Sequence, residues 1–299
     1  MNVRTLLAVS ATSLLAACAG RAAAPRAVAP APAPAPVAVA PAVVPVPAAV
    51  PAAPPATSAP APAAWSAATP VGRIVAERPS AARVLERAGI DYCCGGTVSL
   101  GDAVRARGGA VSLAALLGEL AAVREAPAPA TDRSFTDVPL PEVLRYIEAT
   151  HHGFLRTELP RLAPIVEKVR GVHGTAHPEL EEVATLFATL ERDLPPHLEL
   201  EERRLFPAIV ALDAGRATSS LDRLDVLEAL ALMEAQHDGA GAALHRLRAL
   251  TKGYAVPADA CASYTQLLTG LAALEADLHA HVHLENNVLA PRVQALARR

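Results

Sequence analysis

A repeated pattern of histidine and glutamate in the second half of the chain constrains its fold more than any other feature. Segments 197–207 and 281–291 both follow the pattern H-x-x-x-E-x-x-x-L-x-P, and their first residues lie 84 positions apart. A single histidine precedes each copy at a similar distance, His152 by 45 residues and His237 by 44. The spacing predicts one two-helix unit used twice, which brings four histidines and two glutamates into the same domain.

Apolar residues recur at helical spacing through this half of the chain. Glycine-rich breaks separate four predicted long helices. These helices are expected over residues 139–170, 178–211, 221–251 and 257–297. Four amphipathic helices joined by short loops indicate an all-α, up-down-up-down four-helix bundle. The prolines Pro195 and Pro196 interrupt this pattern directly before His197, and we expect the second helix to restart or bend there.

The repeated residues lie on the apolar stripes of these helices. In the last helix the stripe advances in steps of three and four residues through Leu271, Leu274, Leu278, His281, Glu285 and Val288. The second and third helices carry His197 with Glu201, and His237, on stripes of the same kind. The first helix is ambiguous, because His151 and His152 continue different apolar rows. The spacing of the repeat favours His152.

Buried carboxylates without partners are costly, so two glutamates among four histidines in a helical core indicate bound metal. A single zinc site needs only three or four ligands. Mixed imidazole and carboxylate ligands suit iron, and also manganese. Two bridging glutamates and two histidines at each ion give four protein ligands per ion, and an oxo or hydroxo bridge adds a fifth. The remaining histidines are expected to be exposed or otherwise satisfied: His173, His177, His245, His279 and His283.

The first half of the chain contains no histidine and is organised differently. Residues 1–18 resemble a secretory signal that ends in a lipobox, with Cys18 as the lipidated residue. A short apolar start of a cytoplasmic protein, or an incorrectly assigned start codon, is the alternative. Residues 19–68 form an alanine- and proline-rich linker. The net charge of −3 and the pI of about 6.4 give no argument for binding nucleic acid.

Residues 69–125 are predicted to form a small helical domain, with helices over 81–88, 100–107 and 112–124. Ser80 is the expected N-cap of the first helix, and Gly89 is expected to end it. The loop between the first two helices carries Cys93 and Cys94, followed by two glycines. These adjacent thiols are candidate functional groups, and the alternative is a buried, inert pair. A second linker at 126–137 precedes the bundle at 138–299, in which Cys261 is expected to be structural.

The combination of motifs resembles a known family. The D-Y-C-C-G-G stretch at 91–96 is similar to the N-terminal domain of the iron-sulfur cluster repair di-iron proteins, the repair-of-iron-centres family. The histidine and glutamate motifs of 152–291 are similar to the hemerythrin-like domain of the same family. The resemblance implies a di-iron centre whose ligands are His152, His197, Glu201, His237, His281 and Glu285.

This resemblance implies a protein that repairs iron-sulfur clusters damaged by nitric oxide or peroxide, through donation of iron. Its expected partners are damaged iron-sulfur proteins or cluster-assembly proteins, and a homodimer is compatible with the sequence. The alternatives are reduction of nitric oxide at the di-iron centre, and binding or sensing of oxygen or nitric oxide without catalysis. Proteins of this family are usually cytoplasmic, whereas the start of this chain indicates a cell-envelope lipoprotein that contacts the membrane only through its lipid.

Overall fold

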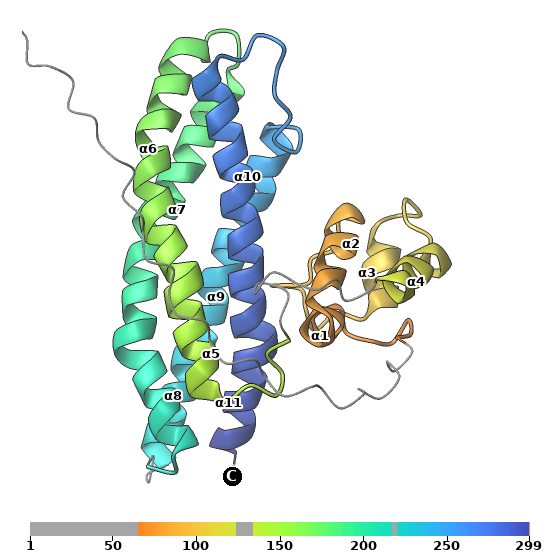
Figure 1. Ribbon diagram of the computed structural model, residues 1–299, viewed down its shortest axis with the longest axis vertical. Coiled ribbons are helices and arrows are strands. Elements are labelled where there is room, and N and C mark those ends of the chain that lie inside the picture. The colour runs from red at the N-terminus through yellow and green to blue at the C-terminus, as the bar shows by residue number, and fades with distance from the viewer. Residues whose placement is uncertain (1–64, 124–133, 217–219, 299) are drawn as a thin grey trace, which may run out of the picture. The chain divides into compact units, whose positions relative to one another are not determined.

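The computed structural model describes residues 65–123, 134–216 and 220–298. The predicted lipidation site Cys18, the first linker up to residue 64 and most of the second linker lie outside the described residues. The described regular structure is helical, apart from one isolated antiparallel bridge between Pro70 and Ser99 (Figure 1). The predicted all-α fold is therefore confirmed.

Four long helical segments form the bundle of the second half, and they lie side by side in Figure 1. A short π-helical segment interrupts three of the four. A π-helix has about one residue more per turn than an α-helix. These segments carry the label η. The first segment comprises α5 (Leu140–Tyr146), η3 (Ile147–His152) and α6 (Gly153–His173). The second comprises α7 (Glu179–Leu200), η4 (Glu201–Leu205) and α8 (Phe206–Asp213). The third is α9 (Ser220–Leu250), and the fourth comprises α10 (Ala262–His283), η5 (Leu284–Leu289) and α11 (Ala290–Ala297).

The structure corrects two details of these helices. Helix α7 continues through Pro195 and Pro196, so it does not restart there, and a bend at these residues stays a prediction. Both prolines face solvent, where water can hydrate the carbonyl groups that lose their amide partners. The last helix begins at Ala262 and not at residue 257. A turn closed by the hydrogen bond from the Ala260 N–H to the Pro257 carbonyl occupies the intervening residues.

The core of the bundle has two apolar clusters, one on each side of the histidine and glutamate positions. One cluster includes Leu155, Leu198 and Leu278, and the other includes Leu205 and Val288. Along each helix, the change from one cluster to the other occurs near the residues of the repeat. The polar residues therefore occupy a layer between two hydrophobic cores, where water has little access.

The small domain contains four α-helices and one short 3-10 turn. The elements are α1 (Val71–Glu77), η1 (Pro79–Ala81), α2 (Ala82–Arg87), α3 (Leu100–Ala106) and α4 (Leu113–Ala122). Helix α1 was not predicted from the sequence. The predicted N-cap at Ser80 was also wrong: Ser80 lies inside the 3-10 turn, and its hydroxyl has no hydrogen-bond partner.

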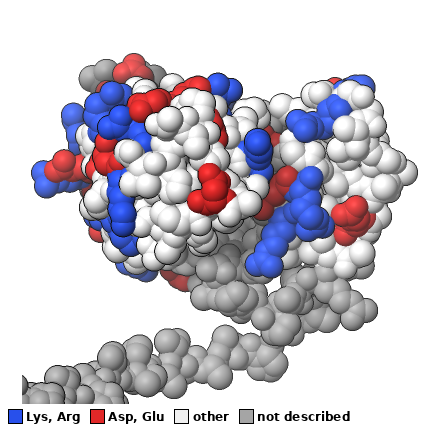
Figure 2. Space-filling view, turned by 90° about the horizontal axis from the view of Figure 1, so that it is seen from above, with Lys and Arg blue, Asp and Glu red and all other residues white. Residues whose placement is uncertain are grey.

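On the face shown in Figure 2, basic and acidic side chains are interspersed and do not form a field of one sign. Among the described helices, none combines the length and the hydropathy that crossing a membrane requires.

Candidate metal centre

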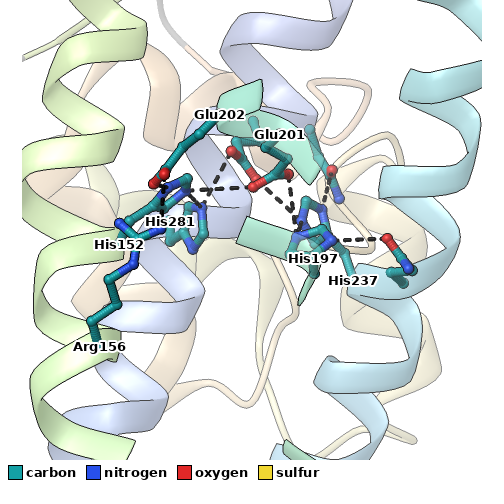
Figure 3. A network of polar contacts seen from close by, with 10 residues as sticks. His152, Arg156, His197, Glu201, Glu202, His237 and His281 are labelled. Atoms are coloured by element: carbon teal, nitrogen blue, oxygen red, sulfur yellow. Dashed lines mark hydrogen bonds and ion pairs between the residues drawn. The ribbon is translucent and has the colours of Figure 1, made fainter. Parts of the chain in front are cut away.

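Six side chains meet in the polar layer of the bundle (Figure 3). They come from all four helical segments, and each is buried: His152 at the end of η3, His197 on α7, Glu201 at the start of η4, His237 on α9, His281 on α10 and Glu285 in η5. These are the six residues that the resemblance implies as ligands. The fold therefore brings together residues that are up to 133 positions apart in the chain.

The six residues form two groups of four that share both glutamates. In the first group, the Nε2 atoms of His152 and His281 are 3.2 Å apart. His152 Nε2 lies 3.4 Å from one oxygen of Glu201, and His281 Nε2 lies 3.2 Å from one oxygen of Glu285.

The second group repeats this arrangement around His197 and His237, whose Nε2 atoms are also 3.2 Å apart. His197 Nε2 lies 3.2 Å from the other oxygen of Glu201, and His237 Nε2 lies 3.1 Å from the other oxygen of Glu285. Each glutamate therefore presents one oxygen to each histidine pair, which is the geometry of a carboxylate that bridges two ions.

The carboxylates of Glu201 and Glu285 provide a direct test of whether this site fits metal. All four of their oxygens are buried and lack a hydrogen bond, although histidine nitrogens approach them to between 3.1 and 3.4 Å. Unpartnered buried carboxylates carry a large desolvation cost unless a cation neutralises them. The donor set and its orphaned oxygens therefore fit a pair of metal ions.

The electrostatics of the glutamate pair point the same way. Burial and the adjacent Glu285 carboxylate raise the pKa of Glu201 well above its usual range. Burial alone would also raise the pKa of Glu285, but its contacts with His281 and His237 outweigh burial and hold that pKa well below its usual range. Burial lowers the pKa of His281 to about 4.

Three of the four histidines are oriented by a side chain that sequence analysis did not assign to the site. The Nδ1 atom of His152 lies 2.7 Å from Glu202, which also pairs with Arg156. His197 Nδ1 lies 2.8 Å from Gln236, and His237 Nδ1 lies 2.8 Å from Asn286. Such partners fix the tautomer and the orientation of a ligand histidine.

The signal for these orienting residues was present in the sequence. Glu202, Gln236 and Asn286 each directly neighbour a residue of the repeat. Each of them orients a histidine on a different helical segment, so the sequence alone could not assign the pairs. The Nδ1 atom of His281 is buried without a hydrogen-bond partner.

The structure distinguishes the two adjacent histidines of the first segment. His152 points into the cluster, whereas His151 Nδ1 lies 2.9 Å from Asp277. The His151 ring stacks on the His281 ring, with centroids 5.5 Å apart and planes 3° apart. His151 therefore lies beside the cluster without facing its glutamates.

The other histidines lie outside the cluster. His279 and His283 face Tyr92 of the small domain, with ring centroids 6.2 and 5.5 Å from the tyrosine ring. His173 contacts the Cys261 sulfur, and His177 pairs with Asp259. His245 lines a cavity beside the small domain.

A cavity of about 550 Å³ reaches the cluster from between α7, α9 and α10. Three of the clustered histidines line it, namely His197, His237 and His281, and most of its remaining wall is apolar. These three histidines therefore face a mostly apolar cavity.

The thiols predicted to be functional lie in the small domain, where Cys93 is buried and Cys94 is partly buried. The Cys94 sulfur lies 3.6 Å from the backbone carbonyl of His237. Cys261 was expected to be structural, but it is an exposed thiol at the N-cap of α10, with its sulfur 3.2 Å from His173 Nε2.

A four-helix bundle whose core holds two histidine pairs and two shared glutamates defines a hemerythrin-like metal-binding protein. Residues 144–293 match the hemerythrin HHE cation binding domain, and residues 67–124 match ScdA_N, a domain of unknown function (DUF542).

Among curated proteins, the iron-sulfur cluster repair protein ScdA of Staphylococcus haemolyticus is 31% identical over 219 residues, covering 73% of this chain and 95% of the relative. The iron-sulfur cluster repair protein YtfE of Enterobacter sp. is 32% identical, covering 76% and 96%. YtfE of Musicola paradisiaca is 33% identical, covering 74% and 94%. The chain belongs to the family of these iron-sulfur cluster repair proteins, as the resemblance implied.

Proposed function

We propose that this chain repairs iron-sulfur clusters by donating iron from a di-iron centre in its bundle. Clusters damaged by nitric oxide or peroxide are the expected substrates, and damaged iron-sulfur proteins or cluster-assembly proteins are the expected partners. The observation that carries the proposal is the shared geometry of the two glutamates, whose four orphaned oxygens each face a histidine nitrogen. The relatives are named iron-sulfur cluster repair proteins, which supports the repair activity, whereas the donation of iron is part of the proposal.

Each of the six residues has a defined role in this proposal. His152 and His281 would hold one iron, His197 and His237 would hold the other, and Glu201 and Glu285 would each offer one oxygen to each ion. Because four protein donors are fewer than the six that iron commonly takes, bound iron would have positions left for a ligand of the acceptor protein. Iron is cargo here, and the site must hold it firmly enough for transport and release it to a client.

Metal analysis of the purified full chain tests the site, and a repair assay tests the activity. We expect two irons per chain, and we expect the iron-loaded protein to reactivate a nitric-oxide-damaged iron-sulfur enzyme with loss of its own iron. Glu285→Gln should bind less iron and repair less, whereas the exposed Glu199→Gln should behave like the parent. One zinc per chain would contradict the site, and unchanged client activity with a fully loaded protein would contradict the repair function.

Reduction of nitric oxide is a second candidate, favoured by the mostly apolar cavity that reaches three of the clustered histidines. A small uncharged substrate partitions into such a cavity more readily than an ion does. This activity predicts nitrous oxide formation with an electron donor, and retention of iron over many turnovers. Iron donation predicts loss of iron in proportion to the client that is repaired, so iron content after reaction separates the two.

For location, we propose a cell-envelope lipoprotein anchored through Cys18, based on the lipobox at residues 15–18. Metabolic labelling with a fatty acid should mark the parent chain in cells and leave Cys18→Ser unlabelled. An unlabelled parent chain would contradict the lipid anchor and favour the alternative, a cytoplasmic location, which is usual for the family.

A further inference from the structure

The sulfur atoms of the adjacent cysteines in the small domain lie close together but are too far apart for a disulfide. Cys93 Sγ and Cys94 Sγ are 3.9 Å apart. A disulfide needs about 2.05 Å. Two thiolates bound to one tetrahedral ion at about 2.3 Å each are separated by about 3.8 Å. At this distance the Cys93 thiol donates a hydrogen bond to Cys94 Sγ, and the same separation fits two thiolates on a single ion.

Asp91 holds the loop in the shape that sets this separation. One of its oxygens accepts hydrogen bonds from the N–H groups of Cys93 and Cys94, at 2.9 and 3.0 Å, and the other accepts from the N–H of Gly95, at 3.0 Å. The Asp91 carboxylate also lies 3.2 Å from the Cys93 sulfur. Three ligand atoms of these residues lie within 4.8 Å of one another.

The sulfur pair is accessible from one side. Cys93 and Cys94 line a cavity of about 560 Å³, which is separate from the cavity lined by His197, His237 and His281 of the cluster. Further potential ligands border this cavity, among them Asp238, His245 and His279. On its other side Cys94 lies against the backbone of α9, where a Cβ at Gly241 would be 3.1 Å from its sulfur.

We propose that Cys93 and Cys94 form a second metal site, which binds one thiophilic divalent cation such as Fe²⁺ through two thiolates. Binding converts two thiols and a cation into a bis-thiolate complex and releases two protons to solvent. The cavity leaves the outer positions of the ion open to a ligand from another protein.

The position of this site suggests a role in iron transfer, and this role rests on the proposed repair function. His237 contributes its imidazole to the bundle cluster, and its backbone carbonyl lies 3.6 Å from the Cys94 sulfur. One residue therefore contacts both sites. We infer that the dithiolate site takes iron from the bundle and presents it to the client.

Cobalt binding to the reduced, iron-loaded full chain tests the site without any repair assay, because Co²⁺ bound to thiolate has a sulfur-to-metal charge-transfer absorption. We expect the band to saturate at one cobalt per chain, with iron content unchanged. Cys93→Ser and Cys94→Ala should abolish the band. The matched control Cys261→Ser, which removes the exposed thiol of α10, should keep it.

Circular dichroism and iron content identify any variant that fails to fold. Cys94 is less buried than Cys93, so Cys94→Ala should disturb folding less than Cys93→Ser. A missing band in the parent protein, or an unchanged band in both variants, would overturn the metal site. Repair by Cys94→Ala at the parent rate would overturn its role in iron transfer. Failure of the parent to repair a client, with the cobalt band present, would contradict the proposed function and leave the metal site standing.

Discussion

Glu201 should affect stability in opposite directions with and without metal. In the metal-free protein, burial and the Glu285 carboxylate raise the pKa of Glu201 well above its usual range, so keeping this acid in the core costs free energy that Glu201→Gln avoids. We expect the metal-free variant to be more stable than the metal-free parent by about 1–3 kcal/mol in urea unfolding. The same variant loses a bridging ligand, so it should bind less iron and gain less stability from loading.

Glu199→Gln is the matched control for this test, because Glu199 lies two positions before Glu201 but faces solvent. It should change neither form by more than about 0.5 kcal/mol. A Glu201→Gln protein that is less stable than the parent in both forms would indicate a polar core network in place of a metal site.

The residues that orient the histidines should set the affinity of the centre. Glu202 contacts His152 and Arg156, so Glu202→Ala frees the His152 ring to rotate. We expect iron affinity to fall about 10- to 100-fold, as measured by competition with a chelator. Glu199→Gln again serves as the control, and equal affinity in the Glu202 variant would exclude an orienting role.

Cys261 should be the most reactive of the three thiols in the described part of the chain. Its hydrogen bond with His173 and the N–H groups of Tyr264 and Ser263 lower its pKa to about 7. Compared with a thiol of pKa 9, the thiolate fraction at pH 7 is roughly 50-fold higher, and lower basicity reduces its intrinsic reactivity about tenfold. Because the N–H groups of Tyr264 and Ser263 remain in His173→Ala, we expect iodoacetamide to label the parent faster than this variant by at most about fivefold.

The labelling rate of Cys261 should rise with pH to a midpoint near 7, and the midpoint should move toward 9 in the His173 variant. Cys93 provides the internal comparison. It is buried, and its hydrogen bond with Cys94, together with burial, raises its pKa. Mass spectrometry distinguishes the two sites, and identical midpoints in the parent and the variant would exclude the His173 contact as the cause.

The long helices were predictable because their apolar stripes persist over many turns, and their starts and ends agree with the sequence to within three residues, except at the start of the last helix. The π-helical turns were not predictable. One additional residue in a single turn barely changes the spacing of apolar residues along a long helix, so the sequence pattern does not reveal it. These turns nevertheless contain His152, Glu201 and Glu285, so they adjust the direction of half of the cluster.

The close packing of α6 against α10 depends on Gly270. A Cβ at this position would lie 2.5 Å from a methyl carbon of Leu162 and 2.9 Å from the Arg161 side chain. We expect Gly270→Leu to destabilise the bundle by about 2–3 kcal/mol through overpacking, measured by urea unfolding. Gly171→Leu places the same side chain in open space on α6 and should stay within about 1 kcal/mol of the parent. Equal effects of the two substitutions would refute this account of the packing.

The contact between the small domain and the bundle could not be predicted from the sequence, because it joins segments almost 200 residues apart. Asn287 Nδ2 donates to the backbone carbonyls of Cys93 and Tyr92, at 2.9 and 3.3 Å. A Cβ at Gly72 or Gly96 would overlap the Asn287 side chain. Gly96 of the Cys-Cys loop and Gly72 of α1 therefore allow Asn287 to approach their backbone. Val282 of α10 completes the small domain's apolar core.

Asn287→Leu should loosen this contact while leaving the bundle folded. The variant loses both hydrogen bonds and leaves two carbonyl groups without these partners, which costs about 1–3 kcal/mol. Cys93 is 5% exposed in the parent, so opening of the contact should increase its rate of alkylation, and amide exchange over residues 90–96 should also accelerate. Gln266→Leu makes the same change at an exposed position of α10 and should alter neither rate. If Cys93 is alkylated equally slowly in the Asn287 variant, the two hydrogen bonds do not hold the Cys-Cys loop against the bundle, and direct transfer of iron from His237 to Cys94 loses its structural basis.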